Sequence, residues 1–281
     1  MTGPAPIISG LHEIAGAYDA LVCDLWGVVH DGLRAHPRAV EALRRFRGDR
    51  GPIVFLTNAP RPPEGVAAQL DKMGVPRDCY DAIIASGGAA REALARRAAR
   101  ETVPLMHLGP ERDMPLFAGL DVRLAGPEEA SVVLCTGLYD DEKETPEDYR
   151  AMLLDLKNRG LPMICANPDI MVPRGDKLVP CAGAVAAAYE ALGGGVAYYG
   201  KPHGEIGRMT LRAAGNPAHP LVVGDGLATD LRMANDMGVD ALFVAEGLHA
   251  RELGPLTPAN LAALFGRWNV SARAAIAALT W

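Results

Sequence analysis

The sequence lacks the cysteine pattern of a disulfide framework or a zinc site. Its five cysteines are odd in number and widely spaced, and they form no C-x-x-C pair. Several lie in apolar runs, where cysteine acts as a small hydrophobic residue. This distribution predicts a protein of the reducing cytoplasm. The five are Cys23, Cys79, Cys135, Cys165 and Cys181.

Long apolar runs and basic clusters are also missing. No stretch of about 18 uncharged apolar residues is present, so we expect no membrane span. The N-terminus lacks the basic segment and apolar core of a signal peptide. The formal net charge is −6 and no run of Lys or Arg occurs, which disfavours nucleic-acid binding. No G-x-G-x-x-G motif follows the first predicted strand, which disfavours a plain nucleotide-binding protein.

The 281 residues, 49% of them hydrophobic and 22% charged, are typical of an ordinary globular protein with two domains. Short apolar runs alternate with helical stretches along the chain, which predicts an α/β protein with a doubly wound parallel sheet. The predicted strands cover residues 20–24, 52–56, 80–85, 103–108, 131–135, 162–166, 196–199, 221–224 and 240–244. The predicted helices begin near residue 37, cover about 62–74, 89–100, 146–159, 183–192 and 203–214, begin again at 229, and cover 258–279.

Three of these strands end in polar residues that a phosphoryl-transfer site needs. Asp24 follows the first strand, Thr57 and Asn58 follow the second, and Asp225 follows residues 221–224, with Asp230 close behind. Ligands of open α/β sheets bind outside the carboxyl ends of the strands, so these residues suggest one site. The middle of the chain contains none of the three clusters. We therefore expect one core domain interrupted by an inserted domain, with Gly193-Gly194-Gly195 as a hinge or linker.

The carboxylates suggest both a nucleophile and a cation site. Asp24, at the end of a buried strand, could form an aspartyl phosphate, although a solvated strand-end residue or a helix cap is an open alternative. Asp225 and Asp230 span a strand-to-helix turn and could converge on one Mg²⁺ ion. The alternative is a turn residue at Asp225, followed by a helix cap at Thr229 or Asp230.

Three further residues could supply hydrogen bonds or positive charge to a phosphate group. Thr57 and Asn58 offer a hydroxyl and an amide, unless they only form an Asn-Ala-Pro turn. Lys201 precedes a helix N-terminus, where lysine is unusual, and could place a point charge on phosphate. An ordinary exposed lysine is the alternative there.

Taken together, these segments resemble the four motifs of the haloacid dehalogenase (HAD) superfamily, in its class IIA branch of NagD-like and p-nitrophenylphosphatase-like phosphatases. Residues 24–32 (DLWGVVHDG) resemble the family's D-x-D-G-V-L-x-x-G opening, and residues 55–58 (FLTN) its strand-end T-N. Residues 200–202 (GKP) resemble its G-K-P, and residues 224–230 (GDGLATD) its G-D-x-x-x-T-D. Residues 165–169 (CANPD) resemble a T-N-x-D stretch of the family's cap domain.

The resemblance implies a Rossmann-like core, residues 1–97 and 196–281, with an inserted α/β cap, residues 98–195. It implies a Mg²⁺-dependent phosphatase of small phosphorylated metabolites, with a cap that closes over the site and sets specificity. It also implies a role for each matching residue: Asp24 as nucleophile and Mg²⁺ ligand, the carbonyl of Trp26 and the carboxylates of Asp225 and Asp230 as further ligands, and Thr57, Asn58 and Lys201 as holders of the transferring group. Caps of this family often mediate dimers, so a homodimer is an open alternative.

One departure from the family pattern concerns proton transfer. Trp26 stands where the family has a second Asp, which protonates the leaving oxygen and later activates water. Indole can do neither. A positioned general acid contributes roughly 10²–10⁴ in rate, about 3–5 kcal/mol, so we expect impaired hydrolysis of ordinary esters. The proton or the substrate contact could come instead from one of the nearby polar residues, which are His30, Asp31, Asn167, Asp169 and His203.

Three functions follow in order of preference. The first is the phosphatase, acting either with a substitute proton donor or on a substrate with a good leaving group. The second is a catalytically impaired protein that binds a phosphometabolite without turning it over. The third is a dehalogenase-like hydrolase, which Asp225 and Asp230 disfavour because dehalogenation needs no Mg²⁺. The natural substrate cannot be predicted from spacing alone.

Overall fold

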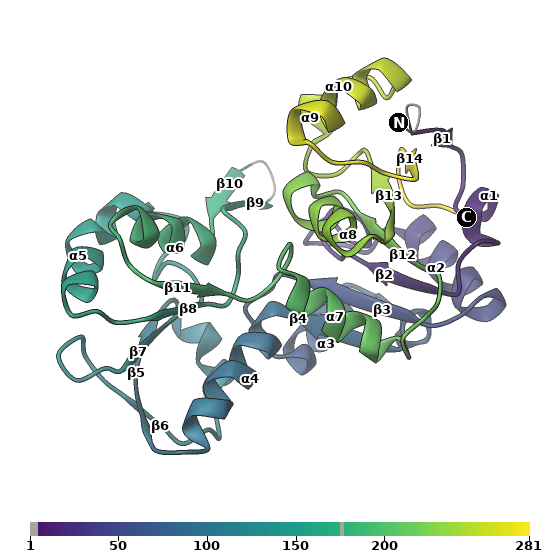
Figure 1. The fold of residues 1–281 in the computed structure, drawn as a ribbon. Coiled ribbons are helices and arrows are strands. Elements are labelled where there is room, and N and C mark those ends of the chain that lie inside the picture. The colour runs from purple at the N-terminus through teal and green to yellow at the C-terminus, as the bar shows by residue number, and fades with distance from the viewer. Residues whose placement is uncertain (1–4, 175–176) are drawn as a thin grey trace. The chain divides into compact units, whose positions relative to one another are not determined.

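In a computed structural model, residues 5–174 and 177–281 are described (Figure 1). The chain divides into two compact units, each with its own parallel sheet. Unit 1 combines the residues up to Thr57 with Ala67–Ile84 and Lys201–Trp281, and unit 2 combines Asn58–Val66 with Ala85–Gly200.

The sheet of unit 1 has seven strands, and the pairings that join six of them, from β1 to β3 in spatial order, are all parallel. Every position of β2 and β3 is buried, which explains why both strands read as continuous apolar runs in the sequence. Strand β2 lies between β12 and β3, and Leu21 pairs with Leu221 on one side and with Ile53 on the other. In spatial order the strands are β1 (Ile7–Ile8), β14 (Ala274–Ile276), β13 (Asp240–Val244), β12 (Pro220–Gly224), β2 (Ala20–Cys23), β3 (Ile53–Thr57) and β4 (Ala82–Ala85).

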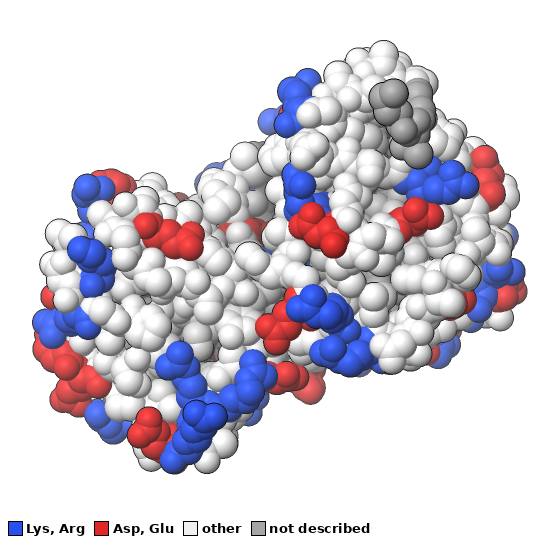
Figure 2. Space-filling model, viewed as in Figure 1, with Lys and Arg blue, Asp and Glu red and all other residues white. Residues whose placement is uncertain are grey.

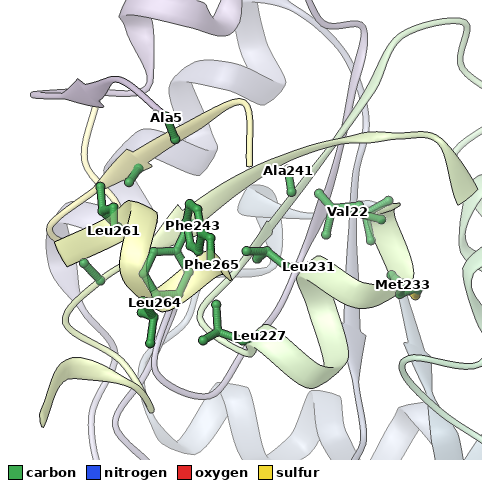
Figure 3. Close-up of a cluster of buried hydrophobic side chains, with 14 of the residues drawn as sticks. Ala5, Val22, Leu227, Leu231, Met233, Ala241, Phe243, Leu261, Leu264 and Phe265 are labelled. Atoms are coloured by element: carbon green, nitrogen blue, oxygen red, sulfur yellow. The ribbon is translucent and has the colours of Figure 1, made fainter. Parts of the chain in front are cut away.

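Helices follow the strands of unit 1, and apolar side chains join several of them to the sheet. Figure 3 shows part of this core, in which Phe243 of β13 meets Phe265 of α10 edge to face at 5.4 Å between ring centroids. Leu227 and Leu231 pack into the same cluster. The helices are α1 (His12–Ala15), α2 (Pro37–Asp49), α3 (Pro63–Lys72, which enters unit 1 at Ala67), η1 (Arg77–Cys79), α7 (Gly204–Ala213), the π-helical turn η4 (Leu227–Leu231), α8 (Arg232–Met237), α9 (Ala250–Leu253) and α10 (Pro258–Trp268).

Unit 2 has a five-stranded parallel sheet and a short antiparallel hairpin. One face of the sheet packs against α5 and α6, and the other packs in part against α4 and η2. The sheet order is β11 (Val196–Tyr198), β8 (Met163–Cys165), β7 (Val132–Cys135), β5 (Val103–Leu108) and β6 (Val122–Leu124), and the hairpin joins β9 (Met171–Arg174) to β10 (Lys177–Pro180). The helices are α4 (Ser86–Ala98), η2 (Glu111–Phe117), η3 (Pro146–Tyr149), α5 (Arg150–Asn158) and α6 (Ala182–Ala191).

The predicted fold class is confirmed: both large sheets are parallel and flanked by helices, in a Rossmann-like arrangement. The prediction of a helical tail over residues 258–279 is wrong in its second half. Helix α10 ends at Trp268, where Asn269 turns left-handed, and residues Ala274–Ile276 then form a buried strand between β13 and β1. Alanine favours helix on propensity, but burial within the sheet decides the structure of this segment.

The two units divide the chain at other residues than the predicted boundaries at 97/98 and 195/196. Helix α4 belongs to unit 2, and β11 pairs with β8 in the second sheet, so unit 2 extends to Gly200. The segment Gly193-Gly194-Gly195 therefore leads from α6 into β11 within unit 2.

The five cysteines, all of them among the described residues, are buried and form no disulfide, in keeping with a role as small apolar residues. Among the residues that the structure describes, no helix combines the length and the apolar character needed to cross a bilayer.

Candidate active site

The central strands of unit 1 bring three predicted site residues to one edge of its sheet. Asp24 directly follows β2, Asp225 directly follows β12, and Thr57 ends β3. These strands are neighbours and parallel, so their carboxyl ends lie together. The backbone N–H of Asp24 donates to the carbonyl of Val223 at 2.9 Å, which continues the sheet pairing to the first carboxylate.

A cluster of three carboxylates lies at this edge. One oxygen each from Asp24, Asp225 and Asp230 lies within 4.8 Å of the others. All three side chains belong to buried residues, with exposed fractions of 8%, 5% and 2% respectively. Across residues 5–174 and 177–281, this is the one group of three or more acidic, histidine or cysteine side chains close enough to share a cation.

Backbone and hydroxyl donors hold two of these carboxylates in place. The Oδ2 atom of Asp225 accepts from the backbone N–H of Leu248 at 2.6 Å. The Oδ2 atom of Asp230 accepts from the N–H of Gly226 at 3.2 Å and from the hydroxyl of Thr229 at 3.3 Å. The carboxylates are therefore positioned before any ligand arrives.

Two glycines allow the chain to approach Asp225. A Cβ atom on Gly27 or on Gly247 would lie 2.1 Å from Asp225 Oδ2, closer than any real contact. Gly27 also has φ +79°, a left-handed conformation that favours glycine. Gly247 and Leu248 lie in the loop after β13, and their contacts with Asp225 are missing from the sequence-based prediction because neither residue has a polar side chain.

Lys201 is a cation bonded to the cluster. Its buried Nζ atom donates to Asp24 Oδ1 at 2.6 Å, to Asp230 Oδ1 at 2.8 Å and to the carbonyl of Leu56 at 3.4 Å. The predicted alternative of an ordinary exposed lysine is wrong, because only 3% of the residue is exposed.

The pKa values reflect an excess of buried negative charge. Burial raises the pKa of Asp225 well above its usual range, and the charges of Asp24 and Asp230 raise it further. Burial also raises the pKa of Asp230, together with the charge of Asp24, to about 6 in spite of Lys201. Burial lowers the pKa of Lys201, but the carboxylates of Asp230 and Asp24 outweigh this and raise it overall. Three carboxylates beside one ammonium form a set of oxygen donors that suits a hard divalent cation such as Mg²⁺.

Unit 2 brings together three other predicted residues. The Asn58 amide donates to Asp169 Oδ1 at 2.8 Å, and the backbone N–H of Asp169 donates to Asn167 Oδ1 at 2.9 Å. Ser86, which the sequence reasoning missed, anchors the same region, because its buried hydroxyl is within hydrogen-bond distance of the carbonyls of Ala59, at 3.1 Å, and Ala166, at 2.6 Å. The signal was present in the sequence, since Ser86 follows a predicted strand.

Trp26 and His30 pack together on the turn after Asp24. Their rings lie 5.5 Å apart, edge to face. The backbone N–H of Gly32 donates to Nδ1 of His30 at 3.0 Å, so the proton of the neutral ring is on Nε2. Burial lowers the pKa of His30 to about 4, with a smaller contribution from the charge of His36. His30 is therefore neutral at pH 7 and has no acidic proton to give.

Two other predicted proton donors have surface positions. Asp31 is exposed and accepts backbone hydrogen bonds from Leu33 at 2.8 Å and Arg34 at 2.7 Å. The bonds from Arg34 and Leu33 lower the pKa of Asp31, so it is ionised at neutral pH. His203 is exposed and precedes α7.

Comparison with known proteins identifies the class of this chain. A model described as haloacid dehalogenase-like hydrolase matches residues 21–123, and one described as HAD-hydrolase-like matches residues 198–264. A crystal structure of a hydrolase of the haloacid dehalogenase-like family from Brucella suis is 41% identical in sequence, with a TM-score of 0.86 over 97% of this chain and all of that one. These matches define the class of the protein as hydrolases with the haloacid dehalogenase fold. The chain belongs to the haloacid dehalogenase-like hydrolase family.

Two further relatives are named for an enzymatic activity. A 5'-nucleotidase from Bacillus subtilis is 28% identical over 239 residues, which are 84% of this chain and 90% of that protein. The crystal structure of a glycerol phosphate phosphatase from Mycobacterium tuberculosis in complex with magnesium is 28% identical, with a TM-score of 0.65 over 84% of this chain and 70% of that one.

Proposed function

We propose that this phosphoric monoester hydrolase is a Mg²⁺-dependent phosphatase of small phosphorylated metabolites that works through an aspartyl phosphate on Asp24. The observation that carries the proposal is the buried cluster of Asp24, Asp225 and Asp230 beside Lys201. The relatives support the substrate class, since their names include a 5'-nucleotidase and a glycerol phosphate phosphatase.

Asp24, Asp225 and Asp230 would hold the cation, and the backbone carbonyl of Trp26 is the further ligand that we propose. When bound, the cation supplies positive charge that offsets the repulsion between a carboxylate and an anionic phosphate. A magnesium complex of a relative supports a divalent ion. We also place the protein in the cytoplasm as part of this proposal.

Each of the site residues has its own role in the proposed reaction. A carboxylate oxygen of Asp24 forms a bond to phosphorus while the bond from phosphorus to the ester oxygen breaks. Lys201, already bonded to Asp24 at 2.6 Å, fixes that carboxylate and adds positive charge beside the transferring group. Thr57 and Asn58 would donate to the phosphoryl oxygens. Water then cleaves the acyl phosphate, which releases inorganic phosphate and restores the Asp24 carboxylate.

The leaving oxygen needs a proton, and Trp26, His30 and Asp31 are not suited to donate one at pH 7. Trp26 cannot, His30 is neutral with its proton on Nε2, and Asp31 is ionised. Asp169 accepts a hydrogen bond from Asn58 through its carboxylate. We therefore propose that the enzyme favours substrates whose leaving group departs without a proton, such as acyl or aryl phosphates.

A series of aryl phosphates tests this proposal. We expect kcat/KM to fall steeply from nitrophenyl phosphate to phenyl phosphate, because the departing oxygen becomes more basic. The Trp26→Asp variant should flatten this dependence and accelerate the poorest substrate by roughly 10²–10⁴. A shallow dependence in the unmodified protein would mean that another group supplies the proton.

A phosphometabolite-binding protein without turnover is the second candidate, and Trp26 is the observation that favours it. In that case Mg²⁺ and a phosphate ester should bind, as measured by calorimetry, while no aryl or acyl phosphate is hydrolysed. Turnover of any such ester that depends on Asp24 rules this candidate out.

A further inference from the structure

Unit 2 contains a groove that the proposed chemistry does not use. Its volume is about 780 Å³, within the range of roughly 300–1,000 Å³ that is usual for small-molecule sites. It lies at the amino ends of β5, β7, β8 and β11, beside the last turn of α4. All of its lining residues belong to unit 2.

The floor of the groove lies beside α4 on one face of the sheet. Ile164 of β8 pairs with Ala197 of β11, and the neighbouring residues of both strands face α5 and α6 on the opposite side. Tyr199 lies two residues beyond Ala197 and therefore on the same face as it. Ile164 is buried in the cluster that includes α4, whereas Ala197 is exposed and Tyr199 is partly buried. The accessible part of the floor is therefore apolar at Ala197, with one aromatic ring at its side.

The wall of the groove is basic. Arg96, Arg97 and Arg100, from the end of α4, line it together with a single acidic residue, Glu101. Arg96 reaches Glu92 only at 3.8 Å, on an exposed surface. Among the described residues, neither Arg97 nor Arg100 has a side-chain hydrogen bond or an ion pair. Figure 2 shows Lys and Arg gathered where Figure 1 draws the lower end of α4.

This concentration of positive charge is unusual in a chain of net charge −6. Many other arginines, such as Arg44, Arg47 and Arg77, are paired with carboxylates. Arginine near a helix C-terminus also stabilises the helix dipole, but that role does not need three guanidinium groups around one hollow.

We propose that this groove binds a nucleoside phosphate. The guanidinium groups of Arg97 and Arg100 bind the phosphate oxygens, which they match in a bidentate geometry. The base lies against the exposed Ala197, beside the ring of Tyr199. The size of the groove, its charge and its apolar floor together fit this class of ligand better than a simple inorganic anion.

The groove is a second site and does not overlap the proposed phosphate contact at Asn58. The first residue of α4, Ser86, is within hydrogen-bond distance of the carbonyl of Ala59, next to Asn58, whereas the arginines are at the other end of that helix. The 13 residues of α4 span about 20 Å at 1.5 Å per residue. A nucleotide bound by Arg97 and Arg100 is therefore a second ligand, separate from a substrate phosphate at Asn58.

Calorimetric titration of the full-length protein with ATP, in the presence of a chelator, tests this inference. We expect one ATP per chain, and binding roughly tenfold weaker or more in the Arg97→Ser/Arg100→Ser double variant. A matched double variant, Arg38→Ser/Arg251→Ser, removes two exposed arginines of unit 1 and should bind as the unmodified protein does. Equal ATP affinity in the two double variants, or no binding by the unmodified protein, would overturn the inference.

Two further measurements separate the parts of the site. Ala197→Glu places a charged side chain on an exposed position of the floor and should weaken ATP binding as strongly as the arginine variant does. Pyrophosphate, which has no base, should bind at least tenfold more weakly than ATP. Equal binding would mean that the base of ATP makes no contact with the floor of the groove. Loss of ATP binding in Lys201→Met, with full binding in the arginine variant, would assign the ligand to the carboxylate site instead.

Discussion

The two units have the same kind of sheet but different carboxyl-end chemistry. At the edge of unit 1, three buried carboxylates surround one lysine. At the edge of unit 2, the uncharged Thr136 follows β7 and lies 2.9 Å from His107 of β5. The comparison teaches that the parallel sheet provides a place for a ligand, whereas the buried charge decides which kind of ligand can occupy it.

One buried acidic residue from each unit shows how the charge around it differs between the two units. Burial raises the pKa of Asp113 in unit 2, and its Oδ1 atom has no hydrogen-bond partner among the described residues. The charges of Arg112 and Arg61 oppose this effect of burial. Burial also raises the pKa of Asp225, but there two further carboxylates add to the effect. Such a cluster of carboxylates suits a divalent cation.

The Asp24→Asn variant should show the largest effect. It removes the proposed nucleophile from the unit 1 cluster, and we expect phosphate release from aryl phosphates to fall by at least about 10⁴-fold. Steady-state phosphate assays with Mg²⁺ measure this. Asp113→Asn is the matched variant in unit 2 and should retain activity. Full activity in Asp24→Asn would remove this residue from the mechanism.

Lys201→Met should be the most destabilising change in the cluster. It leaves three buried carboxylates without their bonded cation, which we expect to cost about 3–5 kcal/mol in the free energy of unfolding when a chelator is present. Urea unfolding measures the loss, and Mg²⁺ should recover part of it. An unchanged midpoint in chelator would mean that Lys201 does not balance these charges.

Asp225→Asn should stabilise the metal-free protein. The amide keeps an acceptor for the Leu248 N–H but removes one of the repelling charges, so the free energy of unfolding should rise. The same variant should lose the rise in Tm that Mg²⁺ gives. Asp113→Asn should keep that rise, because its carboxyl is outside the cluster, and a loss in both variants would contradict the distinction between the units.

The smallest predicted effect is a dependence on pH of the stabilisation that Mg²⁺ gives to the folded protein. The pKa of Asp230 is about 6 in the folded protein against a usual 3.8, so the folded state binds more protons than the unfolded state between these values. The stability contributed by this group in the metal-free protein therefore decreases as pH rises through that window. Mg²⁺ binds the ionised form, so its stabilisation should grow over the same range. Thermal unfolding at about pH 5 and pH 8, with and without Mg²⁺, measures this; an equal rise in Tm at both pH values would contradict it.

Much of the fold and of the candidate site could be predicted from the sequence, because buried parallel strands are continuous apolar runs. Residues 20–24 and 240–244 show this, since both form strands at almost the predicted bounds. Asp24, Asp225 and Asp230 follow such strands or lie in the turn after one, so their convergence follows from topology. Contacts made by backbone groups could not be predicted in the same way. The Leu248 N–H donor depends on the loop after β13, which no side-chain pattern reveals.

Other errors in the predictions from the sequence had a different cause. The strand Ala274–Ile276 has a helix-favouring composition, and only its place between β13 and β1 makes it a strand. His30 was a reasonable proton donor by sequence, but its burial and the hydrogen bond from Gly32 are tertiary properties. Local patterns predict elements well, whereas protonation states depend on what packs around a group.

The most direct test of the central claim is a titration with Mn²⁺, a paramagnetic substitute for Mg²⁺, followed by electron paramagnetic resonance. We expect one tightly bound ion per chain in the unmodified protein and in Asp113→Asn, and none in Asp225→Asn. If the unmodified protein binds no ion, or if Asp225→Asn binds it equally well, the three carboxylates at the edge of unit 1 do not form a metal centre.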